Sequence, residues 1–255
     1  MVEQLQSSRT GAFSAQGRRM TMEDAHVLIE DFVEKGWIYG GIFDGHGGSV
    51  AARYGADHLH HDLARALERG IEIEQAFSRA YQEVARRLEN ERSGSTAATF
   101  LVTDHEVVSA NVGDARTILV REKELVQLST DHRLDIPEEK DRISRSGGSV
   151  QYPYACSKGS CIMPTRTLGD RLVRDIGIIS SPFIKTQSRS AEDTMLVAAC
   201  DGLFDFMDNE EVALFCREFR DPEHLVRALA REILETRRGT DNLTILAVSL
   251  QGFGT

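Results

Sequence analysis

The chain lacks the long apolar segments that would place it in a membrane or send it through one. No apolar run approaches the roughly 20 residues of a membrane-spanning helix. The first residues contain no apolar core typical of a signal peptide, and Val2 stands where N-myristoylation needs glycine. We therefore expect no membrane partner and a cytoplasmic location, with a nuclear pool still open.

The chain also lacks an excess of positive charge. It has 30 Lys and Arg residues against 40 Asp and Glu residues, which gives a formal net charge of -10. Nucleic-acid-binding proteins usually present a basic face to the phosphate backbone, so we expect no nucleic-acid partner. A phosphorylated substrate is not excluded, because bound cations can invert the local charge where a phosphate lies.

Cysteine is scarce, with four residues and no Cys-x-x-Cys pair of the zinc-binding kind. The Cys-x5-Arg pattern of a cysteine-dependent phosphatase is absent as well. A reduced, intracellular setting is the simplest interpretation. A disulfide between Cys156 and Cys161 is the alternative.

The composition is that of one globular unit. Hydrophobic residues make up 41% of the 255 residues and charged residues 27%, and we find no internal repeat or low-complexity tract. We expect an N-terminal extension at residues 1–12, a single catalytic domain at 13–251, and a monomer. Short runs of apolar, β-branched or aromatic residues predict strands at 25–32, 37–43, 96–102, 107–111, 116–120, 195–200 and 243–250.

Apolar residues at helical spacing predict two long helices. The first lies at 74–90 and has the buried stripe Phe77, Ala80, Tyr81, Val84 and Leu88. The second begins at Asp221-Pro222, ends at Gly239 and has the stripe Leu225, Val226, Leu229, Ile233 and Leu234. Many strands with few long helices predict a mostly antiparallel sheet core covered by helices.

One segment, at 131–168, reads differently from the rest. It is rich in glycine and proline and carries only a short predicted helix, at 137–146. Loop-rich segments on a rigid scaffold often control access to a site. We call residues 131–168 the flap.

Carboxylates stand where several predicted strands begin or end. They are Glu23 and Asp24, Asp44, Asp114, Asp201 with Asp205 one helical turn on, and Asp241. An isolated Asp-Gly pair is usually a turn, but a turn does not explain the recurrence at so many strand ends. Desolvated carboxylates need compensating charge, and too few Lys or Arg residues adjoin these positions. Hard divalent cations such as Mg²⁺ or Mn²⁺ would supply that charge.

These acids belong to segments that match a known family in order and spacing. The segments include Arg19-Met-Thr-Met-Glu23-Asp24, Phe43-Asp44-Gly45-His46-Gly47-Gly48, Ser93-Gly94-Ser95-Thr96, Asn111-Val112-Gly113-Asp114, Thr130-Asp131-His132, Leu168-Gly169-Asp170, Asp201-Gly202-Leu203-Phe204-Asp205 and Asp241-Asn242. Over nearly the whole chain, they resemble the metal-dependent serine/threonine protein phosphatases, the PPM family or type 2C protein phosphatases. The resemblance implies a signalling hydrolase that acts on phosphoserine and phosphothreonine in proteins.

The resemblance also implies the fold and the ions. The fold would be α+β, a four-layer α-β-β-α sandwich of two antiparallel β-sheets flanked by helices. Two Mg²⁺ or Mn²⁺ ions would be bound, with Asp44 bridging both. Asp201 and Asp241 would complete the ligands of one ion, and Glu23 and the carbonyl of Gly45 would serve the other.

In many relatives a third, weaker ion lies at the positions of Asp114, Asp201 and Asp205. Asp24 and Asn242 would support the ligands. The chain departs from the family where Arg133-Leu134 replaces the usual Lys-Pro, and where Thr165-Arg166-Thr167 replaces Ser-Arg-Ala. We expect both departures to affect substrate preference through the flap and neither to touch a metal ligand.

The implied mechanism is direct attack of a metal-bridging hydroxide on the phosphate ester. Arg19 would hold the phosphate, since a guanidinium matches two phosphate oxygens; its alternative is a surface salt bridge. His46 would be the general acid for the leaving oxygen, because an imidazole transfers protons near neutral pH. Its alternative is to orient Glu23 or a water.

Two competing functions stay open. One is another two-metal hydrolase, such as a nuclease or phosphodiesterase, against which the acidic composition counts. The other is a binding module on an inactive phosphatase fold, which should have lost at least one metal-binding acid.

Overall fold

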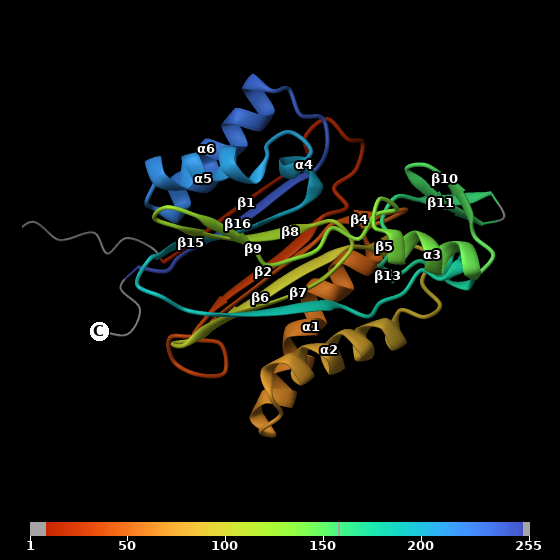
Figure 1. Ribbon diagram of the computed structural model, residues 1–255, viewed down its shortest axis with the longest axis horizontal. Helices are drawn as coiled ribbons and strands as arrows, with labels where there is room; N and C mark the ends of the chain where they lie inside the picture. Colours follow the sequence, from red (N-terminus) through yellow and green to blue (C-terminus); the bar gives the residue numbers. More distant parts are fainter. Residues whose placement is uncertain (1–8, 158, 252–255) are drawn as a thin grey trace, which may run out of the picture.

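Two five-stranded antiparallel sheets lie face to face at the centre of the molecule (Figure 1). The computed structural model describes residues 9–157 and 159–251. The first sheet has the order β1 (Thr10–Ala15), β16 (Leu243–Ser249), β15 (Asp193–Ala199), β8 (Arg116–Arg121) and β9 (Leu125–Gln127). The second has the order β14 (Phe183–Ser188), β7 (Glu106–Val112), β6 (Ala97–Val102), β3 (Ile38–Phe43) and β2 (Ala25–Glu30).

The central strands of both sheets are buried on both faces, and their side chains alternate between two cores. In β15, Leu196 and Ala198 face the opposite sheet, whereas Met195, Val197 and Ala199 face the outer helices. The predicted strands at 37–43, 96–102, 107–111, 116–120, 195–200 and 243–250 therefore all exist, with ends that differ by one or two residues.

Two antiparallel helices cover the outer face of the second sheet (Figure 1). They are α1 (Val50–Glu68) and α2 (Ile73–Arg87). The predicted stripe of α2, from Phe77 to Leu88, is buried at every position. The helix breaks off at Arg87, three residues before the predicted end at Asn90.

The outer face of the first sheet is covered by α4 (Asp201–Phe204), α5 (Asn209–Glu218) and α6 (Pro222–Arg231). Asp221 caps α6, because its carboxylate accepts a hydrogen bond from the backbone of His224 at 2.9 Å. The helix continues as a π-helical turn, Glu232–Thr236. The residue in the left-handed conformation after it is Arg238 (φ 58°), so the predicted closure at Gly239 is displaced by one residue.

The flap is more regular than its sequence predicts. It contains the expected helix, α3 (Pro137–Arg145), and a three-stranded sheet of β10 (Ser149–Gln151), β11 (Tyr154–Ser157) and β12 (Ser160–Ile162). Cys156 and Cys161 face each other across β11 and β12 and form a disulfide, which was the less simple of the two interpretations of the sequence. A small core joins Leu134 and Ile143 of the flap to Ile176 of a 3-10 turn (Arg174–Ile176).

At one end of the sandwich, three two-residue strands form a separate small sheet. They are β4 (Gly45–His46), β5 (Gly94–Ser95) and β13 (Leu168–Gly169). The predicted α+β four-layer sandwich is confirmed. Residues 1–8 of the predicted extension lie outside the described residues, and β1 begins at Thr10. Among the residues described, none of the helices is both long and apolar enough to cross a membrane.

Candidate active site

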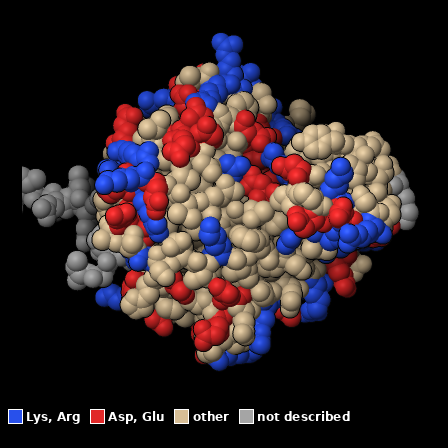
Figure 2. Space-filling model, in the orientation of Figure 1, with Lys and Arg blue, Asp and Glu red and all other residues tan. Residues whose placement is uncertain are grey.

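A pocket of about 420 Å³ opens where the central strands end, beside the flap. On the face drawn in Figure 2, acidic side chains gather in a hollow between the helices of the first sheet and the flap. Nine of the predicted site residues line the pocket: Arg19, Glu23, Asp44, Gly45, His46, Asp114, Asp201, Asp241 and Asn242. The flap contributes Tyr154, Cys161, Ile162, Met163 and Pro164.

The carboxylates meet because each follows or precedes a buried strand that reaches the same end of the sandwich. Asp44 follows β3, Asp114 follows β7, and Asp201 begins α4 just after β15. Burial, together with the charges of Asp201, Asp24 and Asp114, raises the pKa of Asp44 well above its ordinary range. Burial and the neighbouring carboxylates raise the pKa of Asp201 to about 7. These shifts indicate that the carboxylates repel one another and that the neighbouring cations offset their charge only in part.

Asp241 has one cationic partner at the pocket rim. The Nη2 atom of Arg19 lies 2.5 Å from its carboxylate, and 62% of the Arg19 side chain is exposed. Gly17 (φ 62°) lets the chain pass close to Asp241, because a Cβ atom there would lie 2.0 Å from the Asp241 carbonyl oxygen. Arg19 thus forms a salt bridge, which was the alternative interpretation of this residue, and both partners line the pocket.

Hydrogen bonds hold both the side chain and the backbone of Glu23. Its carboxylate accepts from the hydroxyl of Thr21 at 3.0 Å and from the backbone of Gly48 at 3.3 Å. Its backbone N–H donates to Asn242 at 2.8 Å. Gly45 approaches closely, since a Cβ atom there would lie 2.3 Å from the Glu23 carbonyl oxygen. Only glycine allows the two backbones to meet here.

His46 has a partner that the sequence analysis did not assign. Its Nε2 atom lies 2.8 Å from a carboxylate oxygen of Asp170, which is itself buried. Burial alone would lower the pKa of His46, but the hydrogen bond and charge of Asp170 raise it above the ordinary range. Gly94 makes room for this pair, because a Cβ atom there would overlap both side chains. The Leu168-Gly169-Asp170 motif was the sequence signal that could have identified this partner of His46.

Asp24 lies behind the pocket floor, and Asn242 lines the pocket. Asp24 is buried, accepts a hydrogen bond from the Thr244 hydroxyl at 2.7 Å, and does not line the pocket. Burial raises the pKa of Asp24 to about 6. Asn242 donates to the backbone carbonyls of Gln16 and Thr21, which ties the Arg19–Glu23 segment to the start of β16.

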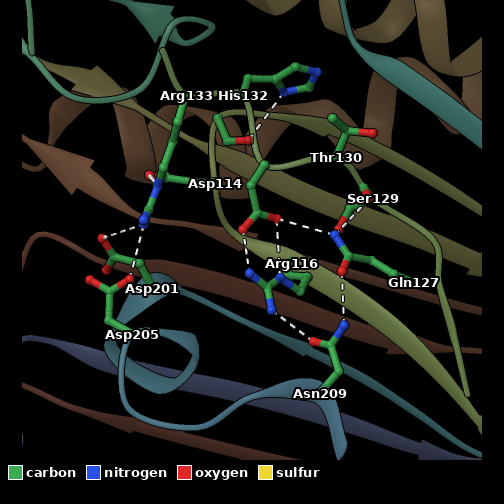
Figure 3. A network of polar contacts seen from close by, with 12 residues as sticks. Asp114, Arg116, Gln127, Ser129, Thr130, His132, Arg133, Asp201, Asp205 and Asn209 are labelled. Carbon is green, nitrogen blue, oxygen red and sulfur yellow. Dashed lines mark hydrogen bonds and ion pairs between the residues drawn. The ribbon is translucent and has the colours of Figure 1, made fainter. Parts of the chain in front are cut away.

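Arg133 enters the acidic group from the flap side (Figure 3). Its Nε atom donates to Asp114 at 2.6 Å, and its Nη2 atom donates to Asp205 at 3.1 Å. The same Nη2 atom lies 3.9 Å from a carboxylate oxygen of Asp201. We expected this departure to touch no metal ligand, yet the side chain of Arg133 contacts or approaches three of the candidate ligands. The sequence does not reveal which way this long side chain points.

The residues on the floor fit divalent cations. Asp44, Asp201, Asp241, Glu23 and the carbonyl of Gly45 supply only oxygen donors, which is the ligand type of Mg²⁺ and Mn²⁺. The raised pKa values of Asp44 and Asp201 indicate negative charge that is only partly balanced. Asp24, Asp44 and Cys200 form a further set of potential ligands, whose ligand atoms lie within 4.8 Å of one another.

Comparison with known proteins identifies the family. The protein phosphatase 2C family model matches residues 8–242. Probable protein phosphatase 2C 59 of Arabidopsis thaliana is 32% identical over 246 residues, which cover 93% of this chain and 78% of that protein. Probable protein phosphatase 2C 7 of Oryza sativa subsp. japonica is 32% identical over 245 residues, and the chain spans only 64% of its length.

A solved structure supports the fold independently. The serine-threonine phosphatase 2C from Toxoplasma gondii superposes with a TM-score of 0.82 at 21% sequence identity, and the match covers 94% of each chain. The family model spans most of this chain, and the Arabidopsis relative aligns over most of both lengths. The chain belongs to the protein phosphatase 2C family of metal-dependent serine/threonine phosphatases.

Proposed function

We propose that the chain hydrolyses phosphoserine and phosphothreonine esters in proteins, with two Mg²⁺ or Mn²⁺ ions bound on the pocket floor. The observation that carries the proposal is the meeting of Glu23, Asp44, Asp201 and Asp241 in one pocket. They come from four separate segments of the chain, and the charges of the group are only partly balanced. Family membership supports the same activity.

Asp44 would contact both ions, as the family resemblance implies, and its carboxylate interacts with that of Asp201. Asp201 and Asp241 would hold one ion, and Glu23 with the carbonyl of Gly45 would hold the other. When bound, such a pair of ions lowers the pKa of a shared water and neutralises charge on the phosphate. Asn242 would keep Glu23 in place through the hydrogen bond that it accepts from the Glu23 backbone.

Arg19 would bind the phosphate oxygens. Its guanidinium is exposed at the pocket rim and contacts Asp241, so a short side-chain movement brings it over the floor. A planar guanidinium donates two parallel hydrogen bonds to a phosphate, which orients the ester for in-line attack.

His46 would protonate the leaving serine or threonine oxygen. The contact of its Nε2 atom with Asp170 leaves Nδ1 as the ring nitrogen available to a substrate. Because its pKa is raised above the ordinary range, His46 retains a proton to higher pH than a free imidazole. Asp170 would orient the ring and stabilise its positive charge.

We further propose a monomer that acts in signalling in the cytoplasm or nucleus, with no nucleic-acid partner. The net charge of -10 supports the last point. The flap would contribute to substrate choice, because Tyr154, Ile162 and Met163 line the pocket opposite the acids.

The test is phosphate release by the purified full chain from a phosphothreonine peptide, beside hydrolysis of bis-p-nitrophenyl phosphate, a phosphodiester. Each substrate is assayed with Mn²⁺, with Mg²⁺ and with EDTA. We expect metal-dependent release from the peptide and little turnover of the diester. Faster diester hydrolysis would favour a phosphodiesterase. A folded chain that is inactive in every metal would favour a binding module.

A further inference from the structure

The three carboxylates at the positions of the third ion already surround a cation of the chain. Arg133 donates to Asp114 at 2.6 Å and to Asp205 at 3.1 Å, and it approaches Asp201 at 3.9 Å (Figure 3). Asp114 is almost fully buried, and only 29% of the Arg133 side chain is exposed. A divalent ion on these three acids would have to share the space and the charge with a guanidinium.

The position of Arg133 is set by the residues next to it. Asp131 is held by Arg116 through two hydrogen bonds, of 3.1 and 2.5 Å. The backbone of His132 donates to Gly113 at 2.9 Å and accepts from Thr165 at 2.8 Å. Arg116 is itself fixed by Asn209 at 2.8 Å and by stacking over the ring of Phe204. The segment that carries Arg133 is thus attached to both sheets before its side chain turns toward the acids.

The charges favour the guanidinium over an added ion. A guanidinium stays charged in proteins, and that of Arg133 donates hydrogen bonds to both Asp114 and Asp205. Two like charges a few ångströms apart in a partly buried site repel each other strongly. An ion could enter only after Arg133 had left Asp114, which would leave that buried carboxylate without its closest partner.

We propose that Arg133 takes the place of the third metal ion, so that the chain binds two ions and balances Asp114, Asp201 and Asp205 with an internal cation. The inference rests on the proposed two-ion function. It gives the departure from the usual Lys-Pro a role at the metal site. Arg133 also joins the start of the flap to Asp205 at the end of α4, which links the flap to the site independently of the metal concentration.

The experiment counts bound Mn²⁺ per chain, by electron paramagnetic resonance of the free ion and by calorimetry, with free Mn²⁺ raised into the millimolar range. The variants are Arg133→Gln, Asp205→Asn and the double variant. Arg237→Gln is the matched control, because Arg237 is similarly exposed, pairs with Glu211 and Glu232, and does not line the pocket.

We expect two Mn²⁺ in the wild type and in Asp205→Asn, three in Arg133→Gln with the third weaker, and two again in the double variant. Without metal, Arg133→Gln should melt about 5 °C below the wild type, and Mn²⁺ should reverse the loss. A similar loss in Arg237→Gln should persist in Mn²⁺. Three Mn²⁺ in the wild type would overturn the inference even if Arg133→Gln did not fold.

A folded Arg133→Gln variant that binds only two ions would overturn the inference as well. Neither count depends on turnover, so an inactive chain that binds two Mn²⁺ would contradict the proposed function and leave this inference standing.

Discussion

Two groups of buried charge, one within the flap and one in the pocket beside it, are balanced in opposite ways. Within the flap, one carboxylate, Glu139 of α3, is surrounded by cations. It accepts hydrogen bonds from Arg142 at 2.6 Å, from Arg166 at 2.7 Å and from the Thr165 hydroxyl at 2.6 Å. Burial alone would raise the pKa of Glu139, but these partners lower it to about 2.

In the pocket, by contrast, carboxylates outnumber arginines. Several carboxylates share Arg19 and Arg133, and burial with mutual repulsion raises the pKa values of Asp44 and Asp201. A buried carboxylate is stable where the chain supplies the counter-charge and costly where it does not. The flap is thus anchored by charges that fold with the chain, whereas the proposed cations of the floor would come from solution.

The largest expected effect comes from a substitution on the pocket floor. Asp201→Asn should lower phosphate release from a phosphothreonine peptide in Mn²⁺ by at least about a thousandfold, because an ion loses an anionic ligand. Without metal, the variant should melt at the same temperature as the wild type or higher, since one of several buried carboxylates that repel one another is gone.

The matched control for Asp201→Asn is Asp57→Asn, which alters an exposed aspartate of α1 and should leave both the activity and the melting temperature unchanged. Activity of Asp201→Asn within tenfold of the wild type would contradict the assignment of Asp201 to the metal site.

The next largest effect comes from removing the charge of Glu139. Glu139→Gln leaves two arginines without their anion and should lower the free energy of unfolding by about 3 kcal/mol. Urea denaturation measures this. Glu138→Gln, at the exposed neighbouring position on α3, should change the stability by less than about 0.5 kcal/mol. Equal stability of the two variants would show that the cations around Glu139 do not stabilise the flap.

A smaller effect separates the two roles considered for His46. His46→Gln should slow phosphothreonine hydrolysis about a hundredfold but change p-nitrophenyl phosphate hydrolysis only a few-fold, because an aryl leaving group needs no proton. Asp170→Asn should follow the same pattern more weakly and shift the basic limb of the pH profile to lower pH. Equal losses on both substrates would remove the general-acid role.

The smallest effect is a pH dependence. The pKa of Glu139 is about 2 in the folded chain and near 4.5 when unfolded, so its contribution to stability is complete above about 4.5 and is lost as the pH falls toward 2. Urea titrations at pH 5 and pH 3 should show the wild type losing about 2 kcal/mol more than Glu139→Gln over this window. Parallel losses would mean that Glu139 titrates normally.

Much of the fold could be predicted because its signals are local. The buried stripe of α2 and the proline at the start of α6 are patterns within a few residues, and both appear where expected. The short strands β10–β12 escaped prediction because they are partly exposed and interrupted by Tyr152-Pro153 and glycine. Strand pairing, the Cys156–Cys161 disulfide and a small core hold them, and none of these is visible in composition.

The amino-acid sequence by itself determined which residues are chemically able to act, because carboxylates placed beside buried strands need a counter-charge. The tertiary structure decided what each carboxylate faces. His46 and Asp170 lie 124 positions apart and come together through β4, β5 and β13. Arg133 and Asp205 lie 72 positions apart in the sequence and form a hydrogen bond. A long side chain has many rotamers of similar energy, and only the packed surroundings select the one that places its charge among these acids.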